Sequence, residues 1–279
     1  MNDLQKELSI AIDLAVEAGR LATRIGEGQF QVTHKSADAS PVTEADRRGN
    51  EIIVAGLERA FPDDRIVAEE SMNPEPGEHP RLWFVDPVDG TKDFVLRNGE
   101  WSVMIGLAIE GEARLGVVYQ AQTDRLYHGI VGSGAWLRAG SEETPLRVRN
   151  TTDPALLTVA ESRNHPDPRI AALCGELGIR QSYSHGSVGL KLAHIAEGRA
   201  DAYFNFSGRC SMWDTCGPDA LIRAAGGDLF DFQGRRLHYG GASSGVKGAF
   251  IATTAALRPH VLERLAARPD LDPLRGNAR

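Results

Sequence analysis

Residues 82–94 read Leu82-Trp83-Phe84-Val85-Asp86-Pro87-Val88-Asp89-Gly90-Thr91-Lys92-Asp93-Phe94. The apolar residues predict a short buried strand, and a turn with two acids three positions apart follows it. Pro87 fixes its own φ and disfavours a helical conformation for Asp86, which restricts where the carboxylates lie. Carboxylate oxygens suit Mg²⁺, which often bridges to substrate phosphates. The stretch favours a metal-dependent phosphate site, and an acidic surface turn is the alternative.

Two other motifs are excluded by counting from Asp86. An EF-hand loop that began there would need glycine at its sixth position and glutamate at its twelfth. The chain has Thr91 and Arg97 at those positions. An aspartyl-phosphatase motif of the DxDxT type spaces its acids two apart, whereas Asp86 and Asp89 are three apart. The spacing therefore favours a metal-activated water over a covalent aspartyl-phosphate.

Composition describes an ordinary globular chain of 279 residues, with 42% apolar and 25% charged residues. A net charge of -7 argues against nonspecific binding to nucleic acids or acidic membranes, but divalent ions would still allow small anionic substrates. The sequence has no apolar run near the roughly 20 residues of a membrane span, and its N-terminus lacks a signal-peptide core. Three cysteines form no CxxC pair or disulfide framework, so we expect a reducing cytoplasm.

The first 150 residues predict helices followed by an antiparallel sheet. Apolar residues at three- and four-residue spacing predict a helix over 4–25 that glycines end, and Pro41-Val42-Thr43 predicts the start of a second helix that Pro62 ends. Short buried strands are predicted at residues 66–69, 82–86, 101–109, 115–119, 126–130 and 135–137. The later strands follow one another through short turns, which is typical of an antiparallel meander.

After Asn150 strands and helices alternate. Strands are predicted at residues 156–160 and 202–206, and helices at residues 168–177, 188–196 and 215–225. This alternation is the α/β pattern. We therefore expect residues 1–150 to carry most of the acidic cluster, and residues 151–279 to form a smaller α/β unit that supplies Asp214 and substrate contacts.

Acids elsewhere in the chain each have an ordinary structural explanation. Asp46 follows Thr43 at the capping-box spacing. Glu69 and Glu70 close a strand, where adjacent residues point to opposite faces, so only one should face a site unless the strand ends there. Asp214 precedes a predicted helix and is a candidate N-cap. None of these acids indicates a site by itself.

Together, four ordered segments resemble the inositol monophosphatase superfamily over roughly residues 35–235. They are Pro41-Val42-Thr43-Glu44-Ala45-Asp46, Ala68-Glu69-Glu70-Ser71, the run from Trp83 to Thr91, and Trp213-Asp214-Thr215-Cys216-Gly217-Pro218-Asp219-Ala220 with Gly226-Gly227. The resemblance implies a mixed α+β and α/β fold. This is the layered αβαβα sandwich of the inositol monophosphatase and fructose-1,6-bisphosphatase type.

Within the superfamily the chain is most similar to the 3'(2'),5'-bisphosphate nucleotidase branch, whose usual motif is DGTKEF followed by RNGEF. The matching segments are Asp89-Gly90-Thr91-Lys92-Asp93-Phe94, Arg97-Asn98-Gly99-Glu100-Trp101 and Gly189-Leu190-Lys191. Asp93 stands where glutamate is usual. The branch implies a Li⁺-sensitive, Mg²⁺-dependent hydrolase that converts adenosine 3',5'-bisphosphate to AMP and phosphate by a metal-activated water.

The resemblance also implies residue roles. The ligands of two to three Mg²⁺ would be Glu69, Asp86, the Val88 carbonyl, Asp89 and Asp214. The residues that orient or deprotonate the attacking water would be Glu70 and the pair Asp46–Thr91, while the amides of Gly90 and Thr91 would hold the phosphate. Lys191 and Arg97 are candidate contacts for a second phosphate, with solvated side chains as the alternative.

Two other functions stay open from the sequence. The first is an inositol monophosphatase or another small-alcohol phosphatase, histidinol phosphate included, on the same scaffold. The second is a noncatalytic binder of metal or phosphometabolites, which should have lost a ligand although every acid is present. The expected partner is a small phosphate ester, and a homodimer is one option for assembly.

Overall fold

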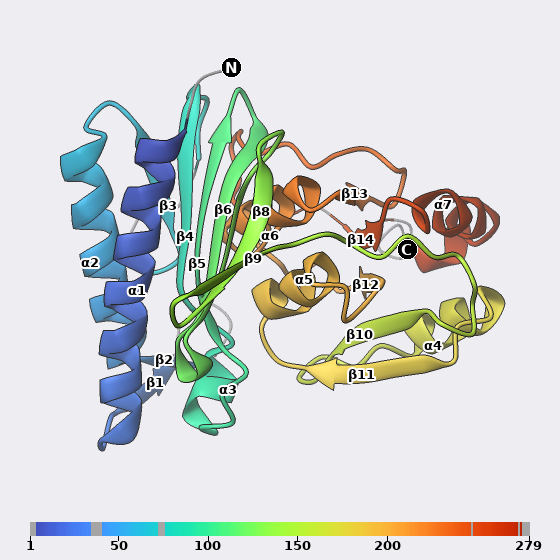
Figure 1. Cartoon of the computed structure of the whole chain (residues 1–279), viewed down its shortest axis with the longest axis horizontal. Helices are drawn as coiled ribbons and strands as arrows, with labels where there is room; N and C mark the ends of the chain where they lie inside the picture. The colour runs from blue at the N-terminus through green and yellow to red at the C-terminus, as the bar shows by residue number, and fades with distance from the viewer. Residues whose placement is uncertain (1–3, 35–40, 72–75, 247, 273, 275–279) are drawn as a thin grey trace.

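Five layers alternate in the computed structural model, which describes residues 4–34, 41–71, 76–246, 248–272 and 274. They are the helices α1 (Gln5–Glu27) and α2 (Glu44–Ala60), a seven-stranded sheet, the helices α5 (Val188–Ala196) and α6 (Met212–Ala224), a five-stranded sheet, and the helices α4 (Pro168–Glu176) and α7 (Arg258–Ala267) (Figure 1). The layered αβαβα sandwich is therefore confirmed.

The seven-stranded sheet is a meander with one parallel edge. Its order is β3 (Arg65–Ala68), β4 (Arg81–Asp89), β5 (Ser102–Ile109), β6 (Glu112–Gln120), β7 (Arg125–Ile130), β8 (Gly134–Ala139) and β9 (Glu142–Pro145). From β4 to β9 every pair is antiparallel, which confirms the meander predicted for β5 to β8, whereas β3 pairs with β4 in parallel. The prediction missed β9, whose residues are all exposed.

A small hairpin corrects the predicted start of the second helix. The strands β1 (Val32–His34) and β2 (Pro41–Thr43) pair antiparallel. Residues 41–43 are therefore extended, and α2 begins after them with Thr43 as its N-cap.

The five-stranded sheet lies wholly after Asn150. Its order is β11 (Gln181–His185), β10 (Thr158–Ser162), β12 (Ala202–Asn205), β14 (Phe250–Thr254) and β13 (Gly227–Asp231). The predicted alternation found β10, α4, α5, β12 and α6, but it missed β11, β13, β14 and α7. The missed edge strand β11 is polar and mostly exposed, so it lacks the apolar signal of a buried strand. The boundary between two units near Asn150 stays a prediction. Helices α5 and α6 pack between the two sheets, so the residues before and after Asn150 share a hydrophobic cluster.

Helix α6 rests directly on the backbone of the first sheet, which fixes where its N-terminus lies. A Cβ on Gly116 would lie 1.9 Å from the carbonyl oxygen of Gly217, and a Cβ on Gly106 would lie 2.4 Å from the Gly217 nitrogen. Only glycine allows this close approach of helix and strand backbones. The first turn of α6 is thereby held beside the end of β4.

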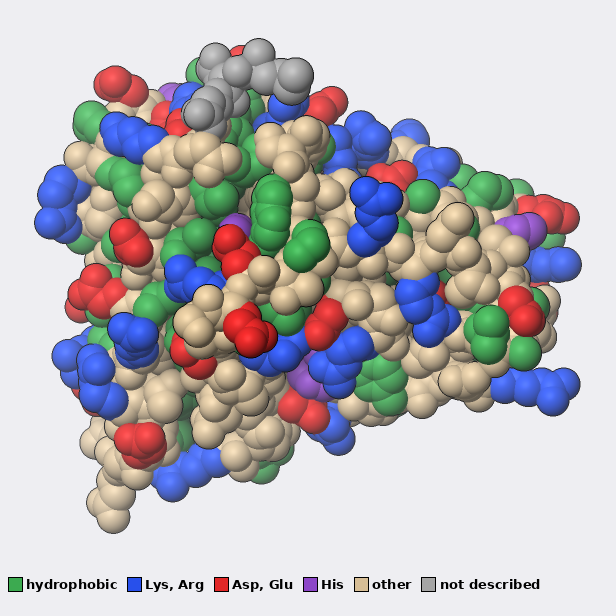
Figure 2. Space-filling view, in the orientation of Figure 1, with side chains coloured by type: hydrophobic (Ala, Val, Ile, Leu, Met, Phe, Trp, Pro, Cys, Tyr) green, Lys and Arg blue, Asp and Glu red, His purple; other side chains and the backbone are tan. Residues whose placement is uncertain are grey.

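The surface mixes charges of both signs. On the face shown in Figure 2, Lys and Arg side chains alternate with Asp and Glu instead of gathering in one patch. None of the helices in the described ranges has both the length and the apolar content needed to cross a membrane. Cys174, Cys210 and Cys216 are free thiols.

Candidate active site

A β-bulge brings the two acids of the opening motif to one point. Along β4 alternate side chains face the helices α5 and α6, and Asp86 continues the face that Phe84 begins. In a regular strand Asp89 would point away, since residues three apart lie on opposite faces. Here Asp86 pairs with Met104 and Asp89 with Ser102, so three steps in β4 oppose two in β5. The predicted turn is therefore an irregularity within the strand, which extends to Asp89.

Asp214 joins these acids from the first turn of α6. It is the third helical residue and not the N-cap as one alternative had it, because Ser211 caps the helix and donates its N–H to Asp214 Oδ2 at 2.6 Å. One carboxylate oxygen from each of Asp86, Asp89 and Asp214 lies within 4.8 Å of the others. Three elements thus place three carboxylates together.

Glu69 and Glu70 lie in a turn, because β3 ends at Ala68. The alternation of a strand therefore does not force them apart. Glu69 lines the same cavity as Asp89 and Asp214. The negative charge of Glu70 contributes to raising the pKa of Asp46, so Glu70 lies near Asp46.

The electrostatics of the cluster match a cation site. Burial first, and then the charges of Glu69, Asp89 and Asp214, raise the pKa of Asp86 well above its ordinary value. Burial and the neighbouring acids also raise the pKa of Asp214. Oxygens on opposite sides of one Mg²⁺ lie about 4.2 Å apart, given bonds of about 2.1 Å. The observed spacing and the all-oxygen donor set therefore fit Mg²⁺, which would relieve the repulsion.

Asp46 and Thr91 form the pair that the sequence implied. The capping box of α2 is confirmed: Asp46 Oδ2 accepts the Thr43 N–H at 2.8 Å and the Thr43 hydroxyl at 2.6 Å. The Thr91 hydroxyl donates to Asp46 Oδ1 at 3.0 Å. Burial raises the pKa of Asp46 although these hydrogen bonds act in the other direction. Thr91 begins the short helix α3 (Thr91–Val95), and Gly90 before it has a φ of 95°, which favours glycine.

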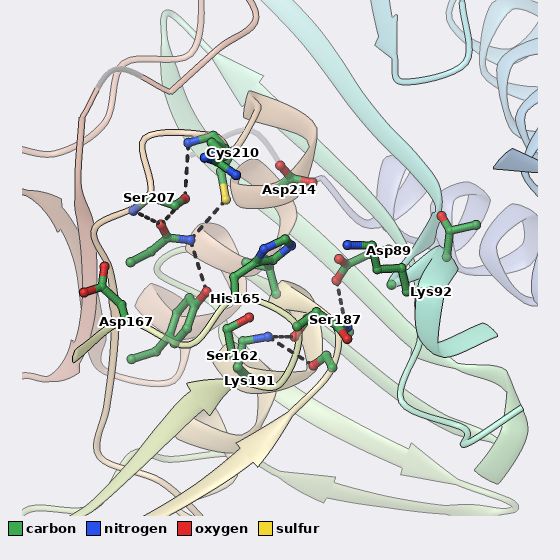
Figure 3. A pocket seen from close by; sticks show the side chains of 18 of the residues that line it. Asp89, Lys92, Ser162, His165, Asp167, Ser187, Lys191, Ser207, Cys210 and Asp214 are labelled. Carbon is green, nitrogen blue, oxygen red and sulfur yellow. Dashed lines mark hydrogen bonds between the residues drawn. The ribbon is translucent and has the colours of Figure 1, made fainter. Parts of the chain in front are cut away.

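The opposite wall of the cavity comes from loops of the second sheet and carries the cation Arg209, together with the acid Asp167, which is paired with Arg169. The cavity has a volume of about 250 Å³, and His165, Asp167, Ser207 and Arg209 line it together with the acids Glu69, Asp89 and Asp214. In Figure 3 the labelled His165 lies, in projection, between Asp89 on one side and Asp167 on the other. Burial and the positive charges of Lys92, Arg209 and Lys191 lower the pKa of His165. One cavity thus joins an acidic wall to a basic one.

The sequence model of the inositol monophosphatase family matches residues 3–267. The chain belongs to the inositol monophosphatase family. It is 36% identical over 229 residues to the 3'(2'),5'-bisphosphate nucleotidase CysQ of Salmonella typhimurium, covering 81% of this chain and 91% of that protein. It is 33% identical over 236 residues to mouse inositol monophosphatase 2, covering 81% and 79%. The crystal structure of CysQ from Bacteroides thetaiotaomicron matches with a TM-score of 0.75 at 29% identity, covering 90% and 97%.

In this member of the family, Lys191 is buried and not solvated. Only 2% of it is exposed, and its Nζ donates to the carbonyls of Ser187 at 2.6 Å, Gly186 at 3.1 Å and His185 at 3.3 Å. Burial lowers the pKa of Lys191 to about 8. Lys191 lines the cavity, but its hydrogen bonds hold the backbone before α5 (Figure 3).

Arg97, the other candidate contact for a second phosphate, lies away from the cavity. Its guanidinium donates to the Gly28 carbonyl at 2.6 Å and lies over the ring of Phe30. Arg97 therefore points to the end of α1, and the residues that line the cavity do not include it.

Ser187 is one of the cavity residues that the sequence analysis did not single out. It caps α5 with a φ of 50°, and its hydroxyl donates to Asp89 Oδ2. The Gly189 N–H donates to the same oxygen at 2.8 Å. A serine directly before the predicted helix 188–196 was the available signal, because serine is a preferred N-cap. His165 and Arg209 lie on loops and had no comparable signal.

Proposed function

We propose that the chain is a Mg²⁺-dependent phosphomonoesterase whose substrate is adenosine 3',5'-bisphosphate, released as AMP and phosphate. The observation that carries the substrate is a pair of cations near His165: Arg209 on the wall opposite the acidic cluster, and Lys92 on α3. The acidic cluster with its cations suits the phosphate that is hydrolysed, and positive side chains suit a second phosphate. The motif wording and the similarity to CysQ support the same branch.

In this proposal the Mg²⁺ ions would be held by the residues implied by the sequence: Glu69, Asp86, the Val88 carbonyl, Asp89 and Asp214. Two to three ions are expected. When bound, Mg²⁺ lowers the pKa of a coordinated water and stabilises the attacking and leaving oxygens.

The remaining roles follow from the hydrogen bonds around Thr91. Because the Thr91 hydroxyl donates its proton to Asp46, its oxygen can accept a hydrogen bond from the attacking water. Asp46 is itself held by Thr43, so the pair orients that water and can accept its proton. Glu70 supplies a second carboxylate on that side, and the amides of Gly90 and Thr91 hold the phosphate. Positioning and charge stabilisation are what phosphoryl transfer needs most.

The test is phosphate release from adenosine 3',5'-bisphosphate, inositol 1-phosphate and fructose 1,6-bisphosphate. We expect Mg²⁺-dependent release with a clear preference for the nucleotide and inhibition by Li⁺. Chelation with EDTA should abolish release, and added Mg²⁺ should restore it. A preference for inositol 1-phosphate would contradict the proposed substrate but not the metal chemistry. Release that survives EDTA would contradict the metal role.

A small-alcohol phosphatase is the second candidate, acting on inositol phosphates or histidinol phosphate. The specific observation in its favour is that Arg97 lies outside the cavity and Lys191 is engaged with backbone carbonyls. The chain is also similar to mouse inositol monophosphatase 2. The cytoplasmic location and the homodimer stay predictions.

A further inference from the structure

The motif that suggested the nucleotidase branch contains a buried acid that contacts the far side of the cavity. Asp93 in α3 is 0% exposed. Its carboxylate accepts the Asn98 side-chain amide at 2.6 Å and the Asn164 side-chain amide at 2.6 Å. Asn98 belongs to the same loop, whereas Asn164 follows β10 in the second sheet. Asp93 therefore links the two walls of the cavity, and the residues that line the cavity do not include it.

Glu100 makes a second link of the same kind. Its carboxylate accepts two hydrogen bonds from the Arg163 guanidinium, at 2.7 and 2.6 Å, and the Gly186 N–H at 2.7 Å. Burial acts to raise its pKa, but the bonds from Arg163 and Gly186 outweigh burial and lower the pKa of Glu100. A bidentate contact between a guanidinium and a carboxylate fixes the relative orientation of the two side chains as well as the distance between them.

Asn98 ties the two acids into one unit. Its side-chain amide donates to Asp93, while its side-chain oxygen accepts the Glu100 N–H at 2.9 Å. The turn from Asp93 to Glu100 therefore has a single arrangement in which both carboxylates face the second sheet.

Gly186 shows how closely the two sides meet. A Cβ placed on Gly186 would lie 2.4 Å from Asp93 Oδ2 and 2.6 Å from the Glu100 carbonyl oxygen. The backbone of Gly186 does not have a positive φ, so glycine is needed here for space and not for conformation. Asp93 thus packs directly against the backbone that leads to Ser187.

The two contacts hold the ends of neighbouring strands. Strands β10 and β11 are parallel, with Ser162 opposite His185, so both end at the same edge of the sheet. In Figure 1 the arrowhead of β11 points toward α3. The loop after β10 carries His165 into the cavity, and the loop after β11 carries Ser187.

We propose that Asp93 and Glu100 are positioning residues that set the distance between the acidic wall and the basic wall. They hold residues 163–167 and 186–187 at a fixed place relative to Asp89. The organic part of a phosphate ester bound on the second-sheet side is then aligned with a phosphate at the acidic cluster. This inference rests on the proposed phosphatase function. It assigns Asp93 and Glu100 of the motif to alignment and not to contact with substrate.

The test compares a substrate that reaches both walls with one that does not. Asp93→Asn keeps the size of the side chain but replaces one of its two acceptor oxygens by an NH₂ group. Either Asn98 or Asn164 then loses its hydrogen-bond acceptor. We expect the KM for adenosine 3',5'-bisphosphate to rise about 10-fold, while the KM for glycerol 2-phosphate and both kcat values change about twofold or less. Arg163→Ala, which removes the partner of Glu100, should act in the same direction with a smaller effect because its side chain is 43% exposed.

An exchange of partners provides the rescue. The double variant Asp93→Asn with Asn164→Asp restores a carboxylate–amide hydrogen bond with the two groups swapped, and it should return the nucleotide KM toward that of the unaltered chain. Asp153→Asn is the matched control. Asp153 is an exposed acid whose carboxylate accepts only a neighbouring N–H among the bonds described, so its loss should change neither KM.

Distinct outcomes would overturn the inference and the proposed function. If Asp93→Asn lowers activity on both esters equally, or changes neither, Asp93 does not set the alignment. If that variant does not fold, Arg163→Ala carries the same comparison, and an equal change on both esters overturns the inference. If the unaltered chain hydrolyses neither ester, the proposed phosphatase function itself is contradicted.

Discussion

The two walls of the cavity are built in different ways. The acidic wall consists of carboxylates at the ends of β3 and β4 and in the first turn of α6, each held by backbone geometry such as a bulge or a capping box. The basic wall consists of side chains on loops of the second sheet, such as His165 and Arg209. In the proposed function, the reaction chemistry would therefore lie on rigid elements, and the recognition of the alcohol on loops. The acidic wall should therefore govern metal dependence, and the basic wall should govern substrate choice.

The largest effect is expected from Asp89→Asn. The variant keeps an oxygen that can accept from Ser187 and Gly189, so the fold should survive. It removes one charge from the proposed ligand set. Loss of a supporting partner typically costs roughly 10–100-fold, so loss of a ligand should cost more, with Mg²⁺ needed at higher concentration. Phosphate release over a Mg²⁺ titration measures both.

The matched change on the basic wall is Asp167→Asn. Asp167 caps α4 and lines the cavity opposite the acidic cluster. The variant Asp167→Asn should leave the Mg²⁺ concentration needed for half-maximal phosphate release unchanged. An equal shift in both variants would show that the two walls are not separate in function.

Ser187→Ala should have the next largest effect, because it tests a direct hydrogen bond from the second-sheet side to the acidic wall. The variant removes the hydroxyl that donates to Asp89. Supporting hydrogen bonds to metal ligands are worth roughly 10–100-fold in metal affinity or activity, so half-saturation by Mg²⁺ should move to higher concentration. Ser184→Ala, at an exposed position of β11, is the control. Unchanged Mg²⁺ saturation in Ser187→Ala would mean that Asp89 is positioned by other groups.

Arg209→Ala sharpens the comparison from the basic side. Arg209 is exposed and lies near His165, so its loss should raise the KM for adenosine 3',5'-bisphosphate by about 5- to 10-fold. The kcat and the Mg²⁺ dependence should stay unchanged, because the acidic wall is intact. Inositol 1-phosphate serves as the internal control, since it has no second phosphate. A parallel loss on both substrates would place Arg209 outside the recognition of that phosphate.

The sequence predicted the acidic wall better than the basic wall, and the reason is the range of the interactions. The pair Asp46–Thr43 and the acids of β4 lie within a few residues of what orients them, so their spacing carries the information. The bulge itself depends on the register with β5, which no local pattern reveals. The environment of Arg97 depends on Gly28, 69 positions away, and on Phe30. Such partners meet only in the folded chain.

The burial of Lys191 and the strand β11 show the same limit. A lysine is usually solvated, and only the fold reveals that the carbonyls of residues 185–187 surround its Nζ. The polar strand β11 carries no apolar alternation, because its edge position leaves it mostly exposed. Apolar periodicity predicts which residues of a strand or helix are buried. It predicts neither the burial of a single lysine nor a polar edge strand.

The smallest effect on catalysis is expected from Asp219→Asn, which shows what a buried acid of α6 does away from the cation site. Burial raises the pKa of Asp219 to about 7 from 3.8, while the Tyr239 hydroxyl donates to it at 3.0 Å. Between about pH 4 and pH 7 the folded chain keeps a proton that the unfolded chain releases, so the free energy of unfolding falls as pH rises through this window. Above pH 7 the burial of Asp219 lowers the free energy of unfolding by its full amount. Asparagine carries no charge, so the variant should be more stable than the unaltered chain at pH 8, by at most about 4 kcal/mol.

This gap should narrow as pH falls from 8 and close below about pH 4, where the unfolded chain also holds the Asp219 proton. Urea unfolding with EDTA at pH 5 and pH 8 measures the gap without a contribution from metal binding, and phosphate release at pH 8 should match the unaltered chain. A gap that is the same at both pH values would show that Asp219 is ionised in the folded chain. That result would contradict the raised pKa of Asp219.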